Sequence, residues 1–159
     1  AEWIGLLCMI AGLAIAVVLF AHVAQHGDLS LWLGGWQPGL GIQLHADVLG
    51  MVFLLMTSLV SLAVGVYASG YFRAQDKQHF WPLWLLLIAA LNGLFVAADL
   101  FNLYVILELL GLTAVALAAL TGSRESVKAA QRYLLIGLLG SMGYLAGVAL
   151  LYAGFGTLD

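Results

Sequence analysis

Stretches of about 20 apolar residues recur along this chain and leave few folds open to it. A helix that crosses the ~30 Å hydrocarbon core of a bilayer needs about 20 such residues. Only 8% of the 159 residues are charged, with five Lys and Arg against eight Asp and Glu, and 64% are hydrophobic. A soluble domain carries about 25% charged residues on its surface. The sequence therefore predicts an all-α integral membrane protein. It excludes a disordered chain and a protein that binds nucleic acid through a basic surface.

We expect one transmembrane domain over residues 1–159, and its five expected spans are 3–24, 48–69, 80–98, 100–120 and 129–152. As one straight helix, residues 80–120 would measure ~60 Å, about twice the membrane, so the chain must turn back, and we place that corner at Asp99. The alternation in residues 42–45 indicates one strand of a small external hairpin. Ser123 is expected to cap the last helix, with Glu125 in its first turn.

The positive charges predict how the helices are oriented. All five fall on two connections that are separated by two spans and so share one side: Arg73, Lys77, Arg124, Lys128 and Arg132. This bias places the N-terminus in the cytoplasm and the C-terminus outside, in a multi-pass protein of the inner (cytoplasmic) membrane. Trp32 and Trp36 are then expected as anchors at the external lipid interface, and the bilayer itself is a partner.

Glu108 is the charged residue that the membrane tolerates least. It lies near the middle of the expected span 100–120, where a carboxylate costs ~2.5–3.5 kcal/mol on insertion scales. Burial disfavours its charged form, so its protonation can change with a nearby charge, as a proton relay requires. The alternative is a protonated Glu that hydrogen-bonds a neighbouring helix for assembly. No Lys or Arg of the sequence has a matching depth, so a cationic partner would have to come from elsewhere.

Other polar side chains are weaker candidates that could support Glu108. Asn92 and Asn102 lie within or near the spans, and Asn102 is expected to hold the corner with Asp99, because it lies about 120° around the helix from Glu108. Lys128 and Arg132 are four residues apart and are expected to contact lipid phosphates or a partner subunit, or simply to be solvated at the membrane edge.

Several residues are expected to be structural. Span 129–152 contains glycines at three- and four-residue spacing, which indicates close helix packing in lipid. Cys8 is expected as a small buried side chain. His22 and His26 share a helix face but lack a third metal ligand. Since the sequence contains no catalytic triad, phosphate-binding loop or metal motif, we expect no catalytic centre, metal or cofactor.

Three segments together resemble one superfamily of membrane subunits. Residues 33–42 read LGGWQPGLGI and are followed by Asp47, residues 92–108 read NGLFVAADLFNLYVILE, and residues 150–158 read LLYAGFGTL. They are similar to motifs of the antiporter-like subunits, which include Mrp-type sodium/proton antiporter subunits, the antiporter-like subunits of respiratory complex I (NADH:quinone oxidoreductase), and subunits of membrane-bound hydrogenases. The second motif is the most specific.

The resemblance implies that the chain is a fragment of a larger antiporter-like helical bundle, corresponding to its helices two to six. It also implies that Glu108 matches the family's essential intramembrane glutamate, which works with a Lys on a later helix. The expected function is part of a proton-translocating subunit of a multisubunit membrane complex, moving protons and, in some members, Na⁺. As an enzyme, the chain would count only as a subunit of a translocase.

Two other functions stay open at this point. The chain could be a structural membrane subunit that scaffolds a complex without moving ions, which the lack of a matching Lys favours. It could also be a quinone- or haem-binding redox subunit, although the placement of all four His residues at helix edges disfavours haem.

Overall fold

The computed structural model describes residues 2–33, 42–72 and 74–156, and among these the chain forms five helices and two strands. The helices are α1 (Glu2–His26), α2 (Val48–Tyr71), α3 (Ala74–Leu94), α4 (Leu100–Ala118) and α5 (Arg124–Phe155). The strands are β1 (Leu29–Leu33) and β2 (Ile42–Ala46), which lie between α1 and α2. Trp36 and most of the segment 33–42 fall outside the described residues.

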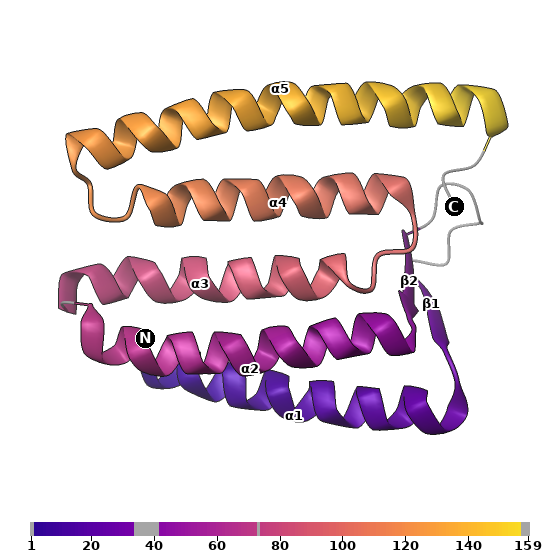
Figure 1. Cartoon of the computed structure of the whole chain (residues 1–159), viewed down its shortest axis with the longest axis horizontal. Helices are drawn as coiled ribbons and strands as arrows, with labels where there is room; N and C mark the ends of the chain where they lie inside the picture. Colours follow the sequence, from indigo (N-terminus) through magenta and orange to yellow (C-terminus); the bar gives the residue numbers. More distant parts are fainter. Residues whose placement is uncertain (1, 34–41, 73, 157–159) are drawn as a thin grey trace.

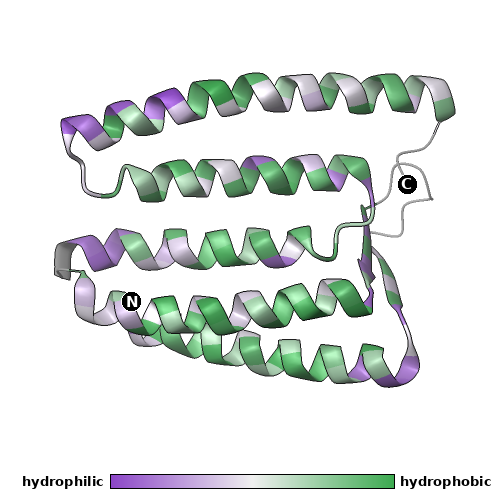
Figure 2. Cartoon of the chain, viewed as in Figure 1, coloured by the Kyte–Doolittle hydropathy of each residue, from purple (hydrophilic) through white to green (hydrophobic). Residues whose placement is uncertain are grey.

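The helices run antiparallel and side by side (Figure 1). α4 lies between α3 and α5, while α1 packs behind α2 and also contacts α3. The α2–α3 and α4–α5 connections lie at one end of the bundle, and the hairpin and the α3–α4 connection lie at the other. The middles of the helices are apolar, and hydrophilic residues gather toward the two ends (Figure 2).

Two helices begin earlier than the expected membrane spans, because polar residues before the apolar run form their first turns. α3 begins at Ala74, well before residue 80, and Asp76 lies in its first turn, where the partial positive charge of the helix N-terminus favours a carboxylate. α5 begins at Arg124, with Ser123 as its N-cap and Glu125 in its first turn, as predicted. The side chain of Ser123 accepts a hydrogen bond from Ser126 N at 3.1 Å.

Four of the described helices, α1, α2, α4 and α5, are long and apolar enough to cross a membrane by length and composition. The exception is α3, whose first turns are polar and which ends at Leu94 rather than residue 98. The fifth span therefore stays an expectation. Its place in the row between α2 and α4 is consistent with a helix at the same depth as its neighbours (Figure 1).

The hairpin predicted from residues 42–45 is present, and it extends onto the α3–α4 connection. β1 and β2 pair antiparallel, with Leu31 opposite Leu44. Residues 96–98 then bind the free edge of β2, because His45 N donates to Val96 O at 2.8 Å and Ala98 N donates to Gln43 O at 3.1 Å. This end of the bundle is therefore held by a short backbone ladder, which satisfies polar groups that the turn would otherwise leave unpaired.

The buried core lies between α1, α2 and α3. One cluster contains Met9, Ala68, Phe80 and Trp81, and a second, nearer the hairpin, contains Ala16, Val23, Met51 and Leu54. By contrast, most of α5 is exposed. The expectation of a buried Cys8 is wrong for the described chain, because Cys8 is exposed on α1. A thiol behaves as a small hydrophobic side chain and can face lipid.

Candidate functional site

Glu108 lies near the midpoint of α4 and lines a groove between α4 and α5. The groove has a volume of about 390 Å³ and is bordered mainly by apolar side chains. Its polar members are Tyr104, Glu108, Tyr133, Ser141 and Tyr144. Glu108 is partly buried and forms no ion pair within the described part of the chain. A carboxyl group in this setting borders a space large enough for water or for a further side chain.

The pairing of α4 with α5 decides what lies opposite Glu108. Tyr104 and Tyr144 stack with ring centroids 6.1 Å apart, and Tyr144 Oη donates to Leu100 O at 3.3 Å. In antiparallel helices this register brings Gly140 opposite Glu108, one turn further along each helix. Gly140 and its neighbour Gly137 both line the groove.

The glycines of α5 face open space among the described residues, so the expected close packing against another helix stays an expectation. A Cβ atom added at Gly137, Gly140, Gly143 or Gly147 would meet no heavy atom within 4 Å among the described residues. Gly137 and Gly140 instead leave open space beside Glu108. The spacing alone could not show this, because it does not say which surface faces the glycines.

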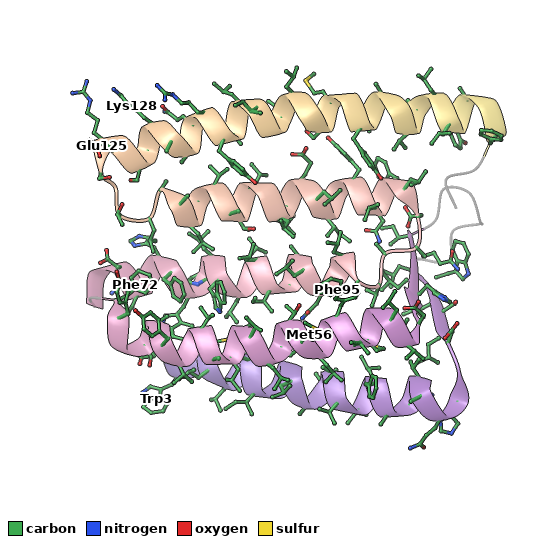
Figure 3. The ribbon with its side chains drawn as sticks, in the orientation of Figure 1. Trp3, Met56, Phe72, Phe95, Glu125 and Lys128 are labelled. Carbon is green, nitrogen blue, oxygen red and sulfur yellow. The ribbon has the colours of Figure 1, made fainter. Side chains whose placement is uncertain are left out.

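Lys128 and Arg132 lie away from Glu108. Both are exposed in the first turns of α5, and neither lines the groove. Figure 3 shows Lys128 with Glu125 at the end of α5 next to the α4–α5 connection. With Gly140 opposite Glu108, Lys128 is twelve residues further along α5, or about 18 Å. Neither cation forms an ion pair with Glu108 among the described residues.

Asp99 and Asn102 build the turn into α4. Asp99 is buried, with 6% of its surface exposed, and caps α4: its Oδ1 accepts from Asn102 N at 2.6 Å. Its Oδ2 accepts from Gln43 N at 3.2 Å, so one carboxylate joins the helix start to β2. The Nδ2 atom of Asn102 is buried without a hydrogen-bond partner among the described atoms. Both residues therefore lie at the corner and not beside Glu108, and Asn102 takes part there through its backbone N–H.

The remaining candidates lie elsewhere. Asn92 faces a separate cavity between α1, α2 and α3. His22 and His26 stack with centroids 4.5 Å apart at the end of α1. Within the described ranges, no group of three or more His, Cys, Asp and Glu side chains lies close enough to hold a metal ion.

The stacked pair Tyr104 and Tyr144 was not identified by reasoning from the sequence. Tyr104 is four residues before Glu108 and so shares its helix face, a spacing that could have identified it. Tyr144 carries no comparable signal, because its place beside Tyr104 depends on how α5 pairs with α4.

Comparison with known proteins agrees with this arrangement. Residues 97–159, which include α4 and α5, match the family model described as NADH:quinone oxidoreductase/Mrp antiporter, TM. The chain is 31% identical over 148 residues to a Na(+)/H(+) antiporter subunit of Alkalihalophilus pseudofirmus, covering 92% of this chain. It is 39% identical over 154 residues to a NADH-quinone oxidoreductase subunit of Desulforudis audaxviator, covering 94% of this chain. In both cases it spans only 30% of the relative's length.

Solved structures show the same fold. A chain of the membrane-bound sulfane sulfur reductase, an archaeal respiratory membrane complex, superposes with a TM-score of 0.93 at 29% identity, covering 99% of this chain and 33% of that one. A chain of the Mrp complex from Dietzia sp. DQ12-45-1b gives a TM-score of 0.87 at 29% identity, covering 98% of this chain and 30% of that one. The chain is therefore a multi-pass membrane protein that is similar, over nearly all of its length, to about a third of the antiporter-like membrane subunits.

Proposed function

We propose that the chain forms part of a proton-translocating antiporter-like subunit of a multisubunit complex in the inner (cytoplasmic) membrane, with Glu108 as its proton site. The complex would perform cation/proton antiport or redox-driven proton pumping, as its relatives' names suggest. The observation that carries this proposal is the position of Glu108, midway along an apolar helix and beside an open groove.

The groove suits a carboxyl group that gains and loses a proton. In hydrocarbon the neutral form is favoured, and an ionised Glu108 needs a positive charge close by. The described residues supply none within reach, so the counter-charge has to enter the groove from another helix. At low effective dielectric, a cation that enters the groove would interact strongly with an ionised carboxylate there. Gly137 and Gly140 leave the space for such an approach.

The proposed orientation follows from charge. Lys77, Arg124, Lys128 and Arg132 lie at the end of the bundle that carries the α2–α3 and α4–α5 connections (Figures 1 and 2). The positive-inside rule favours this end for the cytoplasm. Glu108 would then stand between a cytoplasmic end rich in cations and an external end closed by the hairpin.

The decisive experiment replaces Glu108 by Gln in the natural complex, reconstituted into lipid vesicles. Proton flux is measured with a trapped pH-sensitive dye, driven by a sodium gradient for an antiporter or by electron donor and acceptor for a redox pump. We expect E108Q to lose most of the flux, because an amide keeps the shape but cannot exchange a proton. The matched control is E125Q, which removes an exposed carboxylate from the start of the neighbouring helix.

A purely structural subunit is the competing function, because Glu108 has no ion-pair partner in the described ranges. It predicts that E108Q lowers the yield of assembled complex while the flux per complex stays normal. That result, with E125Q also normal, would overturn the proton-site proposal.

A further inference from the structure

A second pocket, with a mainly apolar lining that includes a few polar side chains, lies away from Glu108. It is a cavity of about 160 Å³ between α1, α2 and α3, and its lining includes Met9 and Gly12 of α1, Ser58 and Ser61 of α2, and Asn92 of α3. Ser58 and Ser61 are buried, with 3% and 2% of their surfaces exposed, and lie near the middle of α2. Polar side chains at this depth need a hydrogen-bond partner, since lipid offers none.

The lining includes the two N–H donors of the Asn92 amide, but the buried polar atom that the structure leaves without a partner there is an acceptor. Ser58 Oγ donates its hydrogen to Leu54 O at 2.8 Å, and Ser61 Oγ donates to Ser58 O at 3.0 Å, so both hydroxyls keep only their lone pairs. Asn92 Oδ1 is buried without a hydrogen-bond partner among the described atoms. An orphaned acceptor of this kind costs about 1–3 kcal/mol. A ligand that donates hydrogen bonds would therefore satisfy the unpaired acceptor of this lining.

We propose that this cavity binds ordered water, held by Asn92 Oδ1 together with the lone pairs of Ser58 and Ser61. Water brings two donors and no net charge, and it needs only about 10–15 Å³ and two to four polar partners. A sodium ion would also accept these oxygens, but no Asp or Glu lines the cavity to offset its charge. Because an uncompensated ion in a low-dielectric interior is far costlier than a neutral molecule, water is favoured.

The bound water would join α2 to α3 inside the membrane. Apolar side chains there gain little by leaving lipid, so hydrogen bonds between helices carry more of their association. This role is independent of Glu108 and of whether the protein moves protons.

Radiolytic footprinting of the natural protein in lipid nanodiscs tests the proposal. X-ray pulses split water into hydroxyl radicals, which oxidise the side chains next to bound water. Met9 lines the cavity, whereas Met51 lies in the second core cluster, and the two are 4% and 0% exposed. We expect Met9 to oxidise about fivefold faster than Met51, because methionine oxidation follows access of the oxidant.

Two variants separate bound water from the small difference in exposure. N92L removes the orphaned acceptor, and G12L extends a large apolar side chain from a position where an added Cβ meets no heavy atom within 4 Å. Each should bring the Met9 rate down to that of Met51, and G12L keeps the test valid if N92L does not fold. Equal rates for the two methionines in the natural protein, or a fast Met9 rate unchanged by the variant that folds, would overturn the proposal. A Met9 rate that falls when sodium chloride replaces choline chloride would assign the cavity to a sodium ion instead.

Discussion

The carboxylate of Asp99 should contribute more to stability than the two other described N-caps, Asp47 and Ser123, because it serves two segments. It accepts from Asn102 N at 2.6 Å, which caps α4, and from Gln43 N at 3.2 Å, which holds β2 against the α3–α4 corner. The side chain is 6% exposed, so water cannot replace it readily. Losing an N-cap costs about 1 kcal/mol, and hydrogen bonds to a charged group contribute about 1.5–3 kcal/mol. We therefore expect D99A to lower the free energy of unfolding by about 3 kcal/mol.

The matched control is D47A. Asp47 caps α2 through one hydrogen bond, accepted from Gly50 N at 2.7 Å, and holds no second segment by its side chain among the described residues. Its loss should cost about 1 kcal/mol. Both variants can be compared by unfolding in mixed detergent micelles with increasing dodecyl sulfate, followed by circular dichroism.

Hydrogen exchange distinguishes the two bonds of Asp99. D99A should accelerate exchange at the amide of Gln43, while D47A should leave it protected, because only Asp99 reaches β2. If D99A proves no more destabilising than D47A and Gln43 stays protected, the carboxylate does not join the hairpin to α4 and the reasoning fails.

Two further predictions concern packing and charge. G5A should destabilise the bundle by about 1–3 kcal/mol, because the new methyl group would overlap the buried ring of Trp81. The control G143A, where an added Cβ meets nothing within 4 Å, should be neutral in the same dodecyl sulfate titration. Equal effects of the two variants would refute the assignment of Gly5 to a tight helix contact. K77Q should lower the free energy of unfolding by less than about 1 kcal/mol, because the ion pair of Lys77 with Glu2, at 2.8 Å, is partly exposed. If this loss of stability persists at high salt, the Lys77 side chain contributes through packing instead.

Much of the local structure could be predicted from the sequence. Apolar runs identify the helices, because a helix is the structure that satisfies its own backbone in lipid. Ser123 and Glu125 indicate where α5 begins, and the alternation in residues 42–45 indicates β2. The helix α3 begins before the expected span 80–98, because the polar residues after Arg73 resemble a loop when read alone, although a first helical turn accepts them at the bundle end.

The sequence by itself determined that this is a membrane protein and that Glu108 lies near the middle of an apolar helix. Only the tertiary structure decided that Gly137 and Gly140 open a groove beside Glu108 and that residues 96–98 pair with β2. It also decided that Asn92 belongs to a cavity with Ser58 and Ser61. The physical reason is that a helix in lipid can be apolar on every side, so its periodicity does not mark the face that meets a neighbour. Contacts between helices depend on shape and hydrogen bonding across the bundle, which a reading along the chain cannot supply.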